Sequence, residues 1–272
     1  MKIQIEKSNL VVFESALFKT TTTLLIGNDY LVLFDPNWLP LEIEFITNYI
    51  AKIKKDRKEY LLFTHSDYDH IIGYGAFKEY ETIASQNFVN NPKQNKIVNQ
   101  INVFDDSHYI NRNYKIEYPL INHIIDCDEQ VLRLGESKFL FWQAVGHNPD
   151  SLLILDTMNN TLVVGDYLSN VEFPYIYTSV KEYKLTLDKI ENIISNYNVE
   201  YLISGHGDFT SDRIEMLKRL KDSRDYINLL EDSVINNKTF NFKKVMERYH
   251  FPIIMKEFHD GNIRLAKKEI NT

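Results

Sequence analysis

The sequence predicts a mixed α/β protein, because segments with the composition of strands alternate with segments that have helical periodicity. Residues 10–35 contain three apolar runs rich in β-branched and aromatic residues, which is typical of strands. Residues 39–55 then place apolar side chains three and four positions apart, and another apolar run follows at 60–65. A strand, a helix and a second strand in succession indicate an α/β architecture.

In the first part of the chain, "TTTLLIG" and "YLVLFD" are expected to pair as a hairpin, because "GND" at 27–29 supplies a turn between them. The helix at 39–55 has glutamates early and lysines late, the distribution that the helix dipole favours. Residues 86–118 are rich in Asn and Tyr and have weaker periodicity. We expect a partly helical excursion there, which either crosses a functional site or lies at the periphery of the fold.

In the second part, "VLRL" and "KFLFWQAVG" flank a turn at "GES", and "SLLILDT" and "TLVVGD" flank a turn at "MNN", so two strand pairs are expected. A helix is predicted at 181–197 and a short buried strand at 201–205. From residue 211 the spacing is helical, and Asp212 followed by Glu215 indicates a capping box. No linker interrupts the chain. We therefore expect a single domain over 1–272, with a core at about 10–210 and a helical C-terminal extension at about 211–272 packed on it.

Composition restricts the classes of partner. The formal net charge of −7 argues against a nucleic-acid partner, and no apolar run reaches the ~20 residues of a membrane span. The single cysteine, Cys127, cannot form an internal disulfide and is interpreted as a small buried residue rather than a reactive thiol. Because charges interrupt the first 18 residues, no signal peptide is expected, and we predict a cytoplasmic location.

Five apolar runs end in a residue that can bind a metal: Asp35, His65, His147, Asp166 and His206. A single polar residue after a strand is ordinary, but in α/β folds the residues beyond the carboxyl ends of strands converge on one site. Asp67, Asp69 and His70 crowd around the second of these strand ends, in "HSDYDH". Side chains so close together would repel one another or lack partners unless a cation drew them together. The sequence therefore predicts a metal site.

Four motifs together resemble the metallo-β-lactamase superfamily. They are His-x-Asp-x-Asp-His at 65–70, "GHNPDS" at 146–151, "VVGD" at 163–166 and "SGHGD" at 204–208. The family pattern is His-x-His-x-Asp-His after a strand, followed by three later ligands in the order His, Asp, His. The resemblance covers about residues 10–210. It implies a four-layer αββα sandwich with a dinuclear site at one edge of the two sheets.

The resemblance also implies a role for each matching residue. One metal ion would be bound by His65, Asp67 and His147, and the other by Asp69, His70 and His206, with Asp166 bridging both. Asp35 matches an aspartate that supports and orients the ligands.

Two positions depart from the family pattern. Asp67 stands where the second histidine is usual, and Asp150 stands where glycine is common. Aspartate is a harder ligand than imidazole, which makes iron or manganese more plausible at the first site. Zinc also accepts carboxylate oxygen and remains the first expectation for the two divalent ions.

By this resemblance the chain is an enzyme, a metal-dependent hydrolase. A hydroxide activated by two metal ions would attack an ester, lactone, thioester or phosphodiester of a small molecule, and Asp69 would orient it and take part in proton transfer. The residues next to the ligands that could line a substrate pocket are Trp38, Tyr68, Asn148, Tyr167 and Phe209. Two alternatives stay open: a di-iron redox protein acting on oxygen or nitric oxide, and a non-catalytic metal-binding or sensing protein. The bond that is cleaved, the metal in the cell and the oligomeric state are not determined by the sequence.

Overall fold

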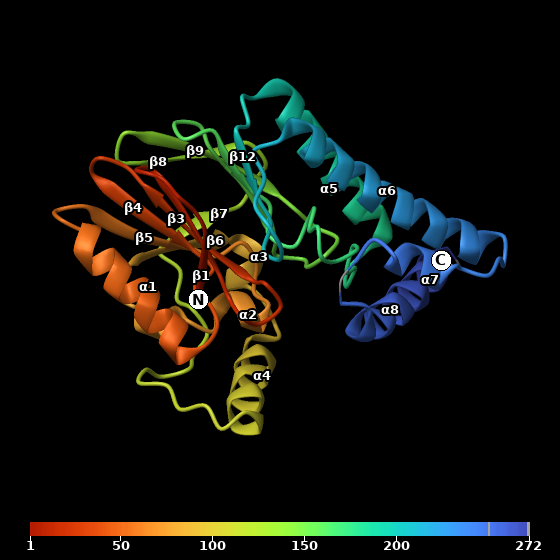
Figure 1. The fold of residues 1–272 in the computed structure, drawn as a ribbon, viewed down its shortest axis with the longest axis horizontal. Coiled ribbons are helices and arrows are strands. Elements are labelled where there is room, and N and C mark those ends of the chain that lie inside the picture. The colour runs from red at the N-terminus through yellow and green to blue at the C-terminus, as the bar shows by residue number, and fades with distance from the viewer. Residues whose placement is uncertain (250, 271–272) are drawn as a thin grey trace.

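The computed structural model of the protein describes residues 1–249 and 251–270, and its larger sheet has seven strands in the same order in space as along the chain (Figure 1). The strands from β1 to β4 pair antiparallel, and those from β4 to β7 pair parallel. The seven strands are β1 (Lys2–Glu6), β2 (Leu10–Glu14), β3 (Thr21–Ile26), β4 (Tyr30–Phe34), β5 (Lys58–Leu62), β6 (Glu81–Ser85) and β7 (His123–Ile125). The expected hairpin around residues 27–29 joins β3 to β4.

The smaller sheet has five strands in the order β12-β11-β10-β9-β8. The strands are β8 (Gln130–Leu134), β9 (Ser137–Gln143), β10 (Leu152–Asp156), β11 (Thr161–Val163) and β12 (Tyr201–Ile203). Neighbouring strands are antiparallel except β11 and β12, which are parallel. The two strand pairs predicted between residues 130 and 166 are therefore present.

Helices cover the outer faces of both sheets (Figure 1). On the larger sheet lie α1 (Pro40–Ile53) and α4 (Gln94–Ser107), with the short helices α2 (Tyr68–Ile71) and α3 (Gln86–Val89) near one edge. On the smaller sheet lie α5 (Val180–Asn196) and α6 (Arg213–Ile235). Two further helices, α7 (Phe242–Met246) and α8 (Pro252–Ile270), follow, and α8 packs against α6 and α5.

The buried side chains form three layers of core that match this arrangement. Ile43, Ile46 and Ile50 of α1 pack on the larger sheet. All five residues of strand β10 are buried, so both faces of this strand must be covered, one by helices and the other by the larger sheet. Leu153 and Leu155 face α5 and α6, whereas Leu152 and Ile154 face the larger sheet, as the two-residue period of a strand requires. The order helix, sheet, sheet, helix confirms the predicted four-layer αββα fold.

Two local expectations need correction. Asp212 does cap α6, accepting from the Ile214 amide at 2.8 Å, but Glu215 pairs with Arg219 at 3.0 Å instead of completing a capping box. Cys127 was expected to be buried and is exposed, because it lies in the connection between β7 and β8. Among the described residues, no helix is both long enough and apolar enough to span a membrane.

Candidate metal centre

The five polar strand ends predicted from the sequence meet where the two sheets open at one edge. The Leu152 amide at the start of β10 donates to the Thr64 carbonyl at 2.8 Å, which ties the end of β5 to the other sheet. A bridge between Thr20 and His206 makes a second connection between the two halves of the fold. Ligands more than 140 positions apart in the sequence therefore share one volume.

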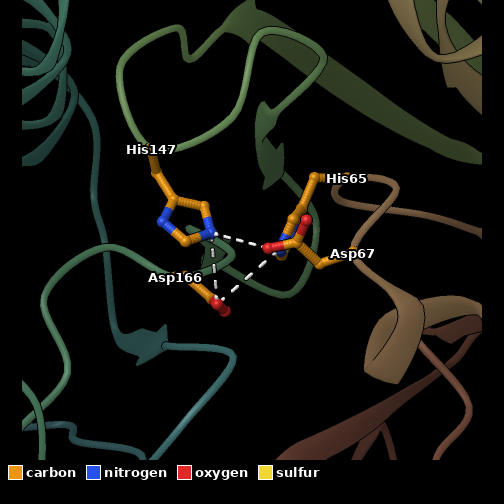
Figure 2. A group of neighbouring side chains, drawn as sticks. All are labelled: His65, Asp67, His147 and Asp166. Carbon is orange, nitrogen blue, oxygen red and sulfur yellow. Dashed lines mark ion pairs between the residues drawn. The ribbon is translucent and has the colours of Figure 1, made fainter. Parts of the chain in front are cut away.

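The seven predicted ligands form two neighbouring groups. The first group is His65, Asp67, His147 and Asp166, and the second is Asp69, His70 and His206; within each group one ligand atom per residue lies within 4.8 Å of the others. Figure 2 shows His147 and Asp67 of the first group pointing at each other and at Asp166, with His147 Nε2 3.3 Å from Asp67 Oδ2 and 3.4 Å from Asp166 Oδ2.

Asp166 faces both groups. Its Oδ1 lies 3.2 Å from His70 Nε2 in the second group. Its Oδ2 lies 3.4 Å from Nε2 of both His147 and His206. A carboxylate placed between two sets of imidazoles in this way is suited to bridging two cations.

The unpaired atoms in these groups fit a bound cation. Nε2 of His65, His70 and His147 and Oδ1 of Asp166 are buried and have no hydrogen-bond partner, and each such atom costs about 1–3 kcal/mol if nothing binds it. The imidazole nitrogens and carboxylate oxygens of the seven residues lie 3.2–3.7 Å apart. Ligand atoms bonded to one zinc ion in tetrahedral geometry are about 3.4 Å apart. The donor set of imidazole and carboxylate suits zinc, and also iron or manganese.

Glycine at position 205 keeps room for this arrangement. A Cβ at Gly205 would collide with Asp166 Oδ1 and would lie 2.8 Å from His70 Cε1. The backbone that carries His206 can therefore approach the other ligands only because residue 205 lacks a side chain.

Each imidazole is held through its other nitrogen, Nδ1. The partners are the Thr64 hydroxyl for His65 at 2.9 Å, Asp35 Oδ2 for His70 at 2.9 Å, the Tyr175 carbonyl for His147 at 2.8 Å and the Phe18 carbonyl for His206 at 3.1 Å. Because Nδ1 carries the proton in each of these bonds, the neutral ring has its lone pair on Nε2, which faces the centre.

Asp35 lies where the resemblance predicted, directly after β4, and its carboxylate is buried behind the ligands. It accepts from the Thr64 amide at 2.8 Å, the Thr64 hydroxyl at 2.6 Å and His70 Nδ1 at 2.9 Å. Since the Thr64 hydroxyl in turn accepts from His65 Nδ1, one carboxylate orients two imidazoles.

The charges in the centre hold extra protons on the histidines when no cation is bound. Burial acts to lower the pKa of His147, but the nearby carboxylates of Asp67 and Asp166 outweigh it and raise this pKa to about 9. Burial also acts to lower the pKa of His70 and of His206. The nearby carboxylates outweigh this effect, so both pKa values lie well above the usual range. Burial would raise the pKa of Asp166, yet the charges of His206 and His70 hold it well below its usual value. A cation that binds here must displace protons.

Asp150, one of the two departures from the family pattern, supports the ligand loop. It is buried and accepts from the Ser66 hydroxyl at 2.5 Å, the Ser66 amide at 3.2 Å and Asn91 Nδ2 at 2.9 Å. It thereby connects the loop of residues 65–70 to segment 146–151 and to the excursion at 86–118. Burial raises the pKa of Asp150.

Above the centre lies a cavity of about 760 Å³. Trp38, Tyr68 and Asn148 line it as predicted, together with the ligands Asp67, Asp69, Asp166 and His206. The excursion at 86–118 contributes Asn91, Lys93, Lys96, Ile97 and Gln100, so it lies over the candidate site and not at the periphery. Tyr175 and Tyr177 form another wall, and Ile254 and Phe258 of α8 complete it.

Tyr167 and Phe209 were expected in the pocket wall and do not line this cavity. Tyr167 is buried, and its hydroxyl donates to the Ala144 carbonyl at 2.8 Å and accepts from the His147 amide at 3.0 Å. Phe209 packs beside the core between the sheets. Tyr167 lies in the turn after β11, where these two hydrogen bonds and the surrounding hydrophobic core hold its side chain away from the cavity.

Sequence reasoning missed Glu172, which lines the cavity. Burial raises the pKa of Glu172 to about 7, against the lowering influence of His206. It follows no strand and belongs to no motif, so no pattern marks it. Thr64, by contrast, directly precedes His65 and could have been considered as a support for its neighbour.

The family model described as the metallo-beta-lactamase superfamily matches residues 16–221, and the chain belongs to this superfamily. No curated protein matches the sequence significantly.

Several solved structures share the fold. The stereoselective inverting sec-alkylsulfatase Pisa1 from Pseudomonas sp. is 14% identical with a TM-score of 0.68; the match covers 96% of this chain and 50% of the sulfatase. The chain thus spans about half the length of that enzyme. A metallo-beta-lactamase family protein from Thermus thermophilus is 14% identical with a TM-score of 0.66, over 97% of this chain and 94% of the other. The metallo-beta-lactamase IND-7 is 18% identical with a TM-score of 0.57, over 84% and 97% of the two chains.

Proposed function

We propose that the chain is a metal-dependent hydrolase that binds two divalent cations and acts on a small organic molecule. His65, Asp67 and His147 would hold one cation, Asp69, His70 and His206 the other, and Asp166 would bridge them. Two bound cations would lower the pKa of a shared water toward neutrality and polarise the group under attack. Zinc is the metal we expect, with iron or manganese as alternatives.

The observation that supports this proposal best is the set of unpaired buried atoms. Three imidazole Nε2 atoms and one carboxylate oxygen converge without hydrogen-bond partners, while each imidazole is fixed from behind through Nδ1. A purely structural polar cluster would pair these atoms with one another or with the backbone. Supported but unpaired ligands are the arrangement that a metal site needs.

The side chains around the cavity would serve the reaction in different ways. Asp69 lies at the floor of the cavity, with Oδ2 3.3 Å from His206 Nε2, and would orient the attacking water and accept its proton. Asp35 and the Tyr175 carbonyl would hold the imidazoles of His70 and His147 in place.

The cavity wall supports a substrate of small to medium size that has an apolar part. Its aromatic and aliphatic side chains include Trp38, Tyr68, Tyr177 and Phe258, and two lysines, Lys93 and Lys96, lie on the wall formed by the 86–118 segment. Esters, lactones, thioesters and phosphodiesters all remain candidates. A cytoplasmic location stays a prediction.

The test combines metal analysis with turnover. Protein purified without chelator is analysed by mass spectrometry for bound metals and assayed against a panel of esters, lactones, thioesters and phosphodiesters. We expect about two divalent ions per chain and turnover of at least one class. His65→Ala should lose metal and turnover together. The matched control is His108→Ala, because His108 is exposed and its Nδ1 contacts only the Phe104 carbonyl.

Three other outcomes would count against the proposal. Two iron ions with visible absorption of an oxo bridge would favour the redox alternative, for which the anionic ligand Asp67 is suited. Full metal content without turnover across the panel would favour a sensing or binding role. Unchanged metal content and turnover in His65→Ala would refute the ligand assignment.

A further inference from the structure

Helix α8 lies beyond residue 221, where the match to the family model ends, yet it reaches the candidate metal centre. It packs against α6 and α5, and two of its side chains, Ile254 and Phe258, line the cavity. The Phe258 ring stacks on the Tyr175 ring with centroids 4.0 Å apart and planes 18° apart. Tyr175 is the residue whose carbonyl holds His147.

The segment around Tyr175 supports His147 at two points. His147 Nδ1 donates to the Tyr175 carbonyl at 2.8 Å, and the Tyr177 amide donates to the His147 carbonyl at 3.1 Å. The first bond sets which imidazole nitrogen carries the proton and therefore leaves Nε2 free toward the centre. Any shift of the Tyr175 carbonyl would turn or release that ring.

Asn262 of α8 holds the same peptide group from its other side. Its Oδ1 accepts from the Ile176 amide at 3.0 Å, and its Nδ2 donates to the Pro174 carbonyl at 2.7 Å. The Ile176 N–H and the Tyr175 C=O belong to one planar peptide unit and point in opposite directions. A continuous path therefore runs from Asn262 Oδ1 through this peptide unit to His147 Nδ1.

All of these groups are buried: Asn262 is 1% exposed, Ile176 3%, and His147 1%. In such surroundings a hydrogen bond to the N–H of a peptide polarises its C=O and strengthens the bond that the carbonyl accepts. A direct partner of a metal-binding histidine typically changes metal affinity about 10–100-fold when removed. Asn262 acts one peptide unit further away.

We propose that Asn262 is a positioning residue for the first ligand group, fixing the Tyr175–Ile176 peptide so that His147 presents Nε2 to the cation. The proposal rests on the proposed function, since it takes His147 to be a metal ligand. It makes α8 part of the metal centre, although the helix contributes no ligand. It also predicts that a change at Asn262 weakens one of two binding steps and not the other.

The test is titration of metal-free protein with Co²⁺, followed by its visible absorption, and with Zn²⁺ against a chromophoric chelator. Asn262→Leu removes both contacts with the segment at nearly constant volume. We expect a loss of affinity of about tenfold, the low end of the range for direct partners, confined to one binding step, with a changed Co²⁺ spectrum. Asn262→Ser, whose side chain is too short to reach both peptide groups, takes its place if the leucine variant does not fold.

His259→Phe is the matched control. His259 also lies on α8 and is buried, and its Nδ1 pairs with the Tyr226 hydroxyl at 3.0 Å, but it has no hydrogen bond with Asn262 or with the 174–176 peptides. This variant should melt at a lower temperature while both metal affinities and the Co²⁺ spectrum stay as in the wild type. If Asn262 had only a structural role, its variants would likewise melt at a lower temperature and keep both metal affinities and the Co²⁺ spectrum of the wild type.

The outcomes separate this inference from the proposed function. If His147→Ala loses one binding step and the folded Asn262 variants keep both affinities within twofold, the positioning role is wrong and the metal site stands. If His259→Phe loses as much affinity as Asn262→Leu, general loosening of α8 explains the effect and the positioning role is again wrong. If His147→Ala binds metal as the wild type does, the ligand assignment itself fails.

Discussion

Replacing Asp35 by asparagine tests the support behind the ligands at almost constant side-chain size. Three donors face this carboxylate: the Thr64 amide, the Thr64 hydroxyl and His70 Nδ1. An amide has one oxygen, so its NH₂ group must face at least one of these donors in a buried place. The Asp35→Asn protein should lose about 1–3 kcal/mol of unfolding free energy, the cost of an unsatisfied buried donor.

The same substitution should weaken metal binding. If the NH₂ group replaces Oδ2, His70 Nδ1 can no longer donate to residue 35. The ring keeps a hydrogen bond there only if Nδ1 accepts from the NH₂ group, and its proton then moves to Nε2, the atom that faces the centre. Loss of such a partner lowers metal affinity about 10–100-fold, which equals about 1.4–2.7 kcal/mol. The assay is Zn²⁺ titration against a chromophoric chelator, with urea unfolding of the chelated protein measured in parallel.

Asp156→Asn is the matched control for this experiment. Asp156 is equally buried and accepts from the Ser137 hydroxyl at 2.5 Å, Asn159 Nδ2 at 2.5 Å and the Met158 amide at 3.0 Å, at the opposite end of β10 from the centre. It should lose comparable unfolding free energy and keep its metal affinity. Wild-type affinity in Asp35→Asn, or an equal loss of affinity in Asp156→Asn, would refute the reasoning.

Three further predictions concern charge and support in the centre. Without metal, the unfolding free energy should fall as the pH rises from about 6.5, the usual pKa of histidine, to about 9, the pKa of His147 in the folded protein. The reason is that the folded state binds this proton more tightly than the unfolded state does. Chemical denaturation at several pH values in the presence of a chelator measures this change. Asp67→Ala should lower bound metal by about one ion per chain in mass spectrometry, because Asp67 belongs only to the first ligand group. Asp150→Gly restores the residue common in the family, yet it should lower the unfolding free energy by about 1–3 kcal/mol, because Ser66 and Asn91 lose their buried acceptor.

Each of these has a contrary result. Stability of the chelated protein that stays level or rises between pH 6.5 and 9 would mean that the carboxylates do not hold protons on the histidines. Equal weakening of both metal-binding steps by Asp67→Ala would contradict its assignment to one group. A wild-type melting curve for Asp150→Gly would show that its hydrogen bonds are replaced at no cost.

Much of the centre follows from local sequence. His65, Asp166 and His206 each lie three residues beyond the end of a short apolar strand, and such strands carry their own signal in composition and length. Because the strands of an α/β fold present their ends at one edge, residues at those ends can be expected to meet. The four-layer fold and the ligands that come together were predictable for this reason.

The features that depend on packing were not predictable in the same way. Tyr167 and Phe209 stand near predicted ligands in the sequence, but their side chains pack in or beside the hydrophobic core and do not line the cavity. The supporting role of Asp150 depends on its hydrogen bonds with Ser66 and Asn91, which lie 84 and 59 positions away in the sequence.

The sequence by itself determined the class of protein and its candidate ligands, because short motifs that follow the strands identify both. Only the tertiary structure decided which walls surround the centre and which residues hold the ligands in place. Asn262 lies 86 positions from the Ile176 amide that it accepts from, and no local pattern connects them. Such contacts arise when helices and loops pack to bury their polar groups in pairs, and that pairing depends on the whole fold.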